Sequence, residues 1–288
     1  MIYLIFSIIC SVTVGVLLKF AKRYQISIAQ AITWNYFFAF CLSAYFFRPE
    51  TAYLTFNSIG SAHLALGFLL PTIFVFLALS VEKTGLARTD IAQRLSLFIS
   101  LTAAYFLFND TFSPLKYVGV AIGFVAIILT LYRPVKQQIN AVNWIYPFVV
   151  FLGFGIIDIC FKRISQQAAM PYTTALSIIF GIAFCFSLVY LTFLLIKRRT
   201  HLQFINMICG AILSFFNFGN IFFYLKAHQA LSNNPSTVFA AMNIGVILCG
   251  SLIGVLLFKE KLSLLNYAGL VFALVAIILI TLTQWHAF

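Results

Sequence analysis

Ten long apolar runs separated by short polar links constrain this chain more than any other feature of its sequence. A helix needs about 20 apolar residues to cross roughly 30 Å of hydrocarbon, and the runs are close to that length. Only 8% of the residues are charged and 63% are hydrophobic, whereas about a quarter are charged in average soluble domains. The pattern therefore predicts an all-α integral membrane protein with ten transmembrane helices, at residues 2–18, 32–47, 62–81, 91–108, 115–131, 144–160, 174–196, 204–225, 237–258 and 264–282.

A charged turn followed by an apolar helix occurs twice, about 150 residues apart. "FNDTFSPLKYVGVAIGFVAIILTLY" begins at Phe108, and "FKEKLSLLNYAGLVFALVAIILITL" begins at Phe258. The sequence "GVLLKFAKR" from Gly15 likewise matches "GIIDICFKR" from Gly155. A unit of five spans is thus repeated. Because five is odd, the second unit enters the membrane from the opposite side, which predicts two inverted five-helix repeats.

These repeated motifs resemble the drug/metabolite transporter superfamily, in the form built from two EamA domains. The resemblance extends over essentially the whole chain, with one EamA-like repeat at 1–133 and a second at 141–284. It implies a multi-pass protein of the plasma (inner) membrane that carries small molecules by alternating access, as a monomer or homodimer. The chain departs from the family pattern where Val14-Gly15 and Phe154-Gly155 replace a frequent Trp-Gly pair.

Charge and motifs exclude several other functions. The net charge is +12, but the basic residues cluster at span ends, where they contact lipid headgroups, so no nucleic-acid partner is expected. The cysteines and histidines show no metal-ligand spacing. No P-loop or nucleophile motif occurs, so we expect neither an enzyme nor a cofactor. Transport would then depend on a gradient, with protons as a candidate coupling ion, or on exchange.

The segment "ARTDIAQRLSLF" carries the strongest polar signal inside a predicted span. An ionisable group within hydrocarbon is expensive and is a functional candidate by default. Asp90 and Arg94 are four residues apart and share a helical face, with Gln93 and Ser96 nearby in the sequence. Arg94 and Gln93 are predicted to bind substrate, since a guanidinium holds a carboxylate or phosphate, and Asp90 to pair with Arg94 or carry a proton. The alternative is an ion pair that only locks the helix to its neighbours.

Asp158, in "GFGIIDICFKR", is a second carboxylate within an apolar run. Burial would favour its protonated form, which suits proton coupling. Lys162 follows one turn later, so an ion pair near the membrane surface is an equal alternative.

Amide and aromatic side chains within other spans are further candidates for substrate binding. Several of them recur at helical spacing on the eighth span, where they form one stripe. They either line a cavity or make hydrogen bonds between helices, and the tryptophan also suits an interfacial belt. These residues are Trp34, Asn35, Asn217, Asn220, Tyr224 and Asn243.

The sequence as a whole predicts a secondary transporter, an exporter or exchanger, for a small polar metabolite such as an amino acid or related carboxylate. A flippase for a lipid or lipid-linked carrier is the alternative, distinguished by a lateral opening to the bilayer. A membrane enzyme would need a cluster of carboxylate, His or Lys at one interface, and only isolated pairs occur.

Overall fold

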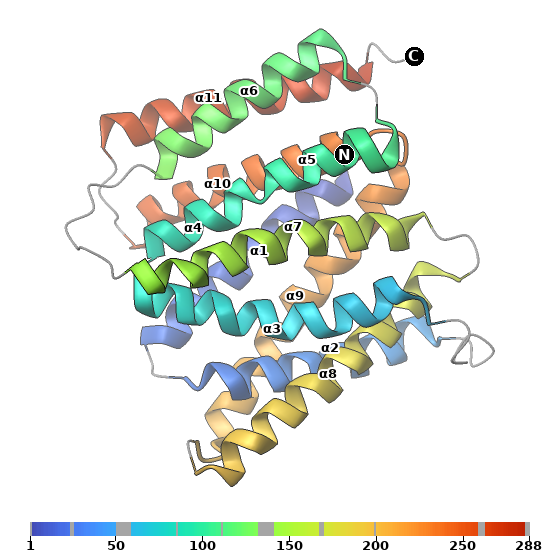
Figure 1. Cartoon of the computed structure of the whole chain (residues 1–288), viewed down its shortest axis with the longest axis vertical. Helices are drawn as coiled ribbons and strands as arrows, with labels where there is room; N and C mark the ends of the chain where they lie inside the picture. Colours follow the sequence, from blue (N-terminus) through green and yellow to red (C-terminus); the bar gives the residue numbers. More distant parts are fainter. Residues whose placement is uncertain are drawn as a thin grey trace. The chain divides into compact units, whose positions relative to one another are not determined.

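Helices account for nearly all of the described chain (Figure 1). The computed structural model describes all residues except 1, 24–25, 50–58, 85, 111, 132–140, 167–169, 199, 259–262 and 286–288. A short 3-10 helix, η3, precedes α7, and no strand occurs among the described residues. The helices are α1 (Ile2–Arg23), α2 (Ile28–Phe47), α3 (Ser61–Thr84), α4 (Leu86–Leu95), α5 (Leu97–Phe108), α6 (Pro114–Leu131), η3 (Ala141–Trp144), α7 (Ile145–Ser165), α8 (Tyr172–Ile196), α9 (Phe204–Ala230), α10 (Pro235–Phe258) and α11 (Leu264–Trp285).

Each of the ten apolar runs contains helix, and nine of them hold one helix each. The run at 91–108 differs, because it is divided at Ser96 between α4 and α5. Within the part of the chain that the structure describes, five helices are by length and composition long and apolar enough to cross a membrane, namely α3, α7, α8, α9 and the Pro235–Leu256 part of α10. Shorter apolar helical stretches lie in α1, α4 and α5, α6 and α11. The number of ten spans stays a prediction.

Turn residues set several helix ends. Asn109 ends α5 in the left-handed conformation, with φ 51° and its backbone N–H donating to the Ala104 carbonyl. Asparagine tolerates this conformation better than most residues. Pro114 and Pro235 occupy the first positions of α6 and α10, where a missing N–H costs no intrahelical hydrogen bond.

The described chain divides into two compact units, each built from both halves of the sequence. Unit 1 comprises residues 79–158 and 230–288 and contains α6 and α11, drawn side by side in green and red in Figure 1. A methyl group on Gly119 would lie 2.9 Å from Cγ1 of Ile280, and Asn266 donates to the Leu129 carbonyl at 3.0 Å. The start of each helix therefore meets the end of the other, so α6 and α11 are antiparallel.

Unit 2 comprises residues 2–78 and 159–229, and α2 and α8 form its most extensive described helix pair. The Thr33 hydroxyl donates to the Ser187 carbonyl at 3.1 Å, and a methyl group on Gly181 would lie 3.3 Å from the Phe40 ring. Residue numbers rise along α2 as they fall along α8, so this pair is antiparallel too. Both helices bury small and polar residues at the contact, as helices in membranes do to approach closely.

Candidate functional site

The fourth predicted span is interrupted at Ser96, between α4 and α5. The Ser96 hydroxyl donates to the Gln93 carbonyl at 2.6 Å, and the Ser96 carbonyl accepts the Ile99 N–H at 2.9 Å. The Ile99 bond spans three residues, so the helix is tightened at this turn, while the Ser96 N–H still donates to the Ala92 carbonyl at 3.3 Å and the Ser100 N–H to the Ser96 carbonyl at 3.2 Å. Serine hydroxyls that return to the backbone in this way bend helices. The interruption is therefore a local distortion of one turn.

Two predicted binding residues, Gln93 and Arg94, lie in the last turn of α4 before this interruption. Both side chains are half-buried. The Asp90 side chain lies outside the described residues, so its predicted pairing with Arg94 stays a prediction. Gln93 also takes part in the interruption itself, since its carbonyl accepts the Ser96 hydroxyl.

Asp158 reaches α5 on the other side of the interruption. The Ser100 hydroxyl, fully buried, donates to the Asp158 carboxylate at 2.7 Å. The two helices approach closely one turn earlier, where a methyl group on Gly155 would lie 2.7 Å from Cβ of Ile99. Glycine at this position therefore brings the carboxylate within reach of α5. The Ser100 contact is compatible with either predicted role of Asp158, as a proton carrier or as the partner of Lys162.

In unit 2, two predicted residues meet across α2 and α9. The Asn217 amide donates to the Asn35 side-chain oxygen at 3.3 Å, and the two side chains are 3% and 2% exposed. Gly210 permits this approach, because a methyl group there would overlap Cβ of Trp34 and lie 2.9 Å from the Ala31 carbonyl.

Trp34 lies in apolar surroundings. Its ring meets Phe37 edge-on, with 5.7 Å between centroids. It also lines a hollow of about 390 Å³, whose other walls come chiefly from aliphatic and aromatic side chains of α2 and α8. The Trp34 ring therefore packs among aromatic and aliphatic side chains, although the next residue, Asn35, makes a polar contact.

A stripe of seven residues runs along the buried side of α9, and five of them are polar. Its members follow one another at intervals of three or four residues, as one face of a helix requires. The large residues exposed on α9 are apolar, among them Ile205, Ile212 and Phe215. We call this stripe the α9 polar face. It consists of Asn206, Gly210, Ser214, Asn217, Ile221, Tyr224 and His228, and the apolar Leu213, Leu225 and Ala227 are buried on α9 as well.

Tyr224, a predicted binding residue, belongs to this face. Its ring lies 4.7 Å from the His228 ring and 6.0 Å from the Phe161 ring, between centroids. His228 and Lys162 are both fully buried. Ionisable side chains are thus gathered towards the C-terminal end of α9.

The remaining predicted amides have local partners. Asn220 accepts a hydrogen bond from the Ser7 hydroxyl at 2.8 Å and is half-buried. Asn243 donates to the Phe239 carbonyl one turn back on α10, at 3.1 Å. Asn220 therefore joins α9 to α1, while Asn243 makes a bond within its own helix.

Gln30 forms a second polar contact between α2 and the start of α9. Its amide nitrogen donates to the Thr200 hydroxyl at 2.8 Å and the His201 carbonyl at 2.7 Å. Its oxygen accepts the Gln203 N–H at 3.1 Å and the Asn206 amide at 3.0 Å. Gln30 is fully buried and makes all four hydrogen bonds that a glutamine amide can make. We call this arrangement the Gln30 clasp.

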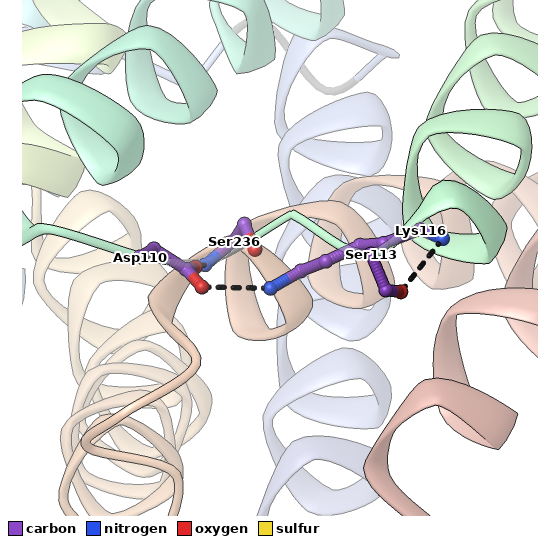
Figure 2. A network of polar contacts seen from close by, with 4 residues as sticks. All are labelled: Asp110, Ser113, Lys116 and Ser236. Carbon is purple, nitrogen blue, oxygen red and sulfur yellow. Dashed lines mark hydrogen bonds and ion pairs between the residues drawn. The ribbon is translucent and has the colours of Figure 1, made fainter. Parts of the chain in front are cut away.

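A buried ion pair joins the α5–α6 turn to the start of α10 in unit 1 (Figure 2). Lys116 Nζ lies 2.8 Å from one Asp110 oxygen, and the other oxygen accepts the Ser236 N–H at 2.9 Å. The Lys116 N–H donates to the Ser113 hydroxyl at 3.3 Å. The Asp110 carboxylate thus caps α10, where the positive end of the helix dipole favours an anion.

Sequence reasoning missed several of these residues. Ser100 and Ser214 are ordinary small residues of apolar runs, and nothing in their immediate sequence distinguishes them. The α9 polar face had a visible signal, because its polar residues recur at three- and four-residue spacing from Asn206 to His228. Only Asn217, Asn220 and Tyr224 were predicted from that helix.

Comparisons with known proteins relate the chain to transporters. Residues 143–282 match the EamA-like transporter family. An uncharacterized protein of Haemophilus influenzae is 42% identical over 284 residues, covering 95% of each chain. A crystal structure of another protein has a TM-score of 0.75 at 12% identity, covering 99% of this chain and 97% of that one. The last likeness concerns the fold alone, and membership of residues 1–133 in the EamA-like family stays a prediction.

Proposed function

Because the chain belongs to the drug/metabolite transporter superfamily, with an EamA-like domain at residues 143–282, we propose that it is a secondary transporter of a small polar metabolite. The proposed substrate is an amino acid or related carboxylate, moved by export or exchange across the plasma (inner) membrane. The α9 polar face carries this proposal. A helix that spans hydrocarbon gains nothing by burying asparagine, serine and histidine unless they contact one another or a polar ligand.

Helix pairing supports alternating access between inverted repeats. Equivalent helices of the two repeats are separated by about 150 residues, so α11 corresponds to α6 and α8 to α2. An inverted repeat requires equivalent helices to run in opposite directions. The antiparallel contacts of Gly119 with Ile280 and of Thr33 with Ser187 agree with that requirement.

Arg94 is the proposed carboxylate-binding residue. Arg94 lies in the last turn of α4, two residues before Ser96, and its side chain is half-buried. Gln93 would contribute a neutral amide beside it. Across the interruption, Asp158 and Ser100 form the pair best suited to accept and release a proton, because a carboxylate inside a membrane protein is a common proton carrier.

Uptake into proteoliposomes tests the proposal. Purified protein would be reconstituted and offered radiolabelled amino acids, with and without an imposed pH gradient. Wild-type protein should accumulate at least one of them, and Arg94→Ala should abolish accumulation without loss of folded protein. Arg163→Ala is the matched control, because this arginine is exposed at the end of α7. Equal transport by wild type and Arg94→Ala would exclude Arg94 from the site.

A flippase is the second candidate, and the hollow beside Trp34 favours it. About 390 Å³ lined mainly by Phe37, Phe184 and leucines of α8 suits an acyl chain better than a polar metabolite. A fluorescent-lipid scrambling or flipping assay in the same proteoliposomes distinguishes the two. Lipid movement with no amino-acid uptake would replace the leading proposal.

A further inference from the structure

Two buried hydroxyl groups in unit 2 have no hydrogen-bond partner among the described residues. The Tyr36 side chain on α2 and the Ser214 side chain on α9 are both fully buried, and neither hydroxyl makes a hydrogen bond of ordinary length there. More than about 90% of buried polar groups in folded proteins are bonded. An unbonded buried hydroxyl costs about 1–3 kcal/mol, so two of them in one helix pair require an explanation.

The Tyr36 hydroxyl belongs to the polar contact between α2 and α9. Tyr36 follows Asn35, and its hydroxyl interacts with the Asn217 side chain without a hydrogen bond of ordinary length. Ser214 lies one turn before Asn217 on the α9 polar face. The Asn35–Asn217 hydrogen bond therefore joins the two helices next to Tyr36 and one turn from Ser214.

The Gln30 clasp shows what a structural contact between these helices looks like. Gln30 uses every donor and acceptor of its amide on neighbouring residues, and no capacity is left for a ligand. The hydroxyls of Tyr36 and Ser214, about two turns further along α2 and α9, have no such hydrogen bonds. The contact at Gln30 is thus fully hydrogen-bonded, whereas the contact near Tyr36 and Ser214 is not.

We infer that Tyr36, Ser214, Asn35 and Asn217 form a binding subsite for an uncharged hydrogen-bonding group of the substrate, a hydroxyl or a carboxamide. Two amides and two hydroxyls offer both donors and acceptors. These four residues contribute no formal charge to the subsite, so it would penalise an ionised group that had to be desolvated there. The inference rests on the proposed transport function, and it adds Tyr36 and Ser214 as specificity residues.

Stability without any substrate provides the first test. A hydroxyl that serves only packing stabilises the fold, so its removal lowers the melting temperature. A hydroxyl kept for a ligand is unbonded in the free protein, so Tyr36→Phe and Ser214→Ala should leave the melting temperature unchanged or raise it. Controls are Tyr45→Phe, exposed on α2, and Ser187→Ala, whose hydroxyl bonds within α8. A clear fall in both test variants, absent from Tyr45→Phe, would overturn the inference.

Paired amino acids of nearly equal shape provide the second test. Uptake of radiolabelled L-serine and L-alanine, and competition by L-asparagine and L-aspartate, would be measured with the reconstituted full chain. Wild-type protein should prefer serine to alanine and asparagine to aspartate. Tyr36→Phe and Ser214→Ala should each weaken apparent serine affinity about tenfold and leave alanine unaffected.

The outcomes separate the two proposals. Serine transport that both variants retain at wild-type affinity would overturn the subsite and leave the transporter intact. A preference for alanine over serine would also overturn the subsite alone. Failure of wild-type protein to transport any amino acid or related carboxylate would overturn the proposed function, and the subsite with it.

Discussion

Lys116 and Asp110 form an ion pair of 2.8 Å in which the two side chains are 2% and 0% exposed. The pair joins the turn after α5 to α6. Asp110 also accepts a hydrogen bond from the Ser236 N–H at the start of α10. Such a buried charge is stable only because each oxygen has a donor.

Removal of the cation alone should destabilise unit 1. In Lys116→Met the carboxylate stays buried with the Ser236 N–H as its remaining described donor, and loss of one partner of a buried pair costs about 3–5 kcal/mol. Denaturant unfolding in detergent measures this. Lys83→Met is the control, because Lys83 and Glu82 pair on the surface, and its midpoint should not change. Similar midpoints for the two variants would show that the buried pair contributes nothing.

Proton coupling should depend on Asp158. Asp158→Asn retains the shape and can still accept the Ser100 hydroxyl but cannot release a proton. Accumulation driven by a pH gradient should therefore cease, while exchange of internal for external substrate continues. Proteoliposome uptake under the two conditions measures both rates. Glu82→Gln, exposed on α3, should behave as wild type. Gradient-driven uptake that survives in Asp158→Asn would assign this carboxylate to structure.

Gly210 should tolerate no side chain. A methyl group would overlap Trp34 and approach the Ala31 carbonyl, so Gly210→Ala must separate α2 from α9. Overpacking of this kind costs about 1–3 kcal/mol, which should appear as a lower melting temperature. Gly250→Ala, with open space around the new methyl group, should leave it unchanged or slightly higher, because alanine favours helix. The same loss in both variants would argue against the close contact.

The Gln30 clasp should protect the link between α8 and α9 from proteolysis. Gln30→Leu removes four hydrogen bonds and leaves the His201 carbonyl and the Asn206 side chain with fewer partners. We expect faster tryptic cleavage after Lys197 and Arg198, measured by mass spectrometry in detergent. Gln166→Leu, the same change at an exposed glutamine after α7, should be cleaved at the wild-type rate. Unchanged cleavage of Gln30→Leu would show that packing alone orders the link.

Helix positions were predictable from the sequence, because charged and turn residues separate the apolar runs. The interruption at Ser96 was not, since a serine within an apolar run bends a helix only when its hydroxyl returns to the backbone. That choice depends on tertiary surroundings. The contact of Ser100 with Asp158 was hidden for a similar reason, because it requires Gly155 to bring α7 close to α5.

The structure shows which candidate residues lie together, and their roles in binding stay predictions. Asn35 and Asn217 are hydrogen-bonded to each other. Their polarity suggested a polar partner for each, but the sequence does not show which residue that partner is. Asn220 was assigned to the same stripe as Asn217, yet it turns to Ser7 of α1. A spacing of three residues allows Asn220 to share a contact with Asn217 or to face a different helix. The packing of α9 against its neighbouring helices decides which of these occurs.

The α9 polar face has a consequence for how the protein is made. A segment enters the membrane from the translocon according to its own apolarity, and the serine and asparagine near the middle of α9 oppose that step. Neighbouring helices that receive its polar side chains would lower the cost. Asn35 on α2 is synthesised long before Asn217. It is therefore already in the bilayer, and can bond Asn217, when α9 leaves the translocon. Biogenesis of unit 2 should therefore be ordered, with α9 retained in the bilayer only after α2.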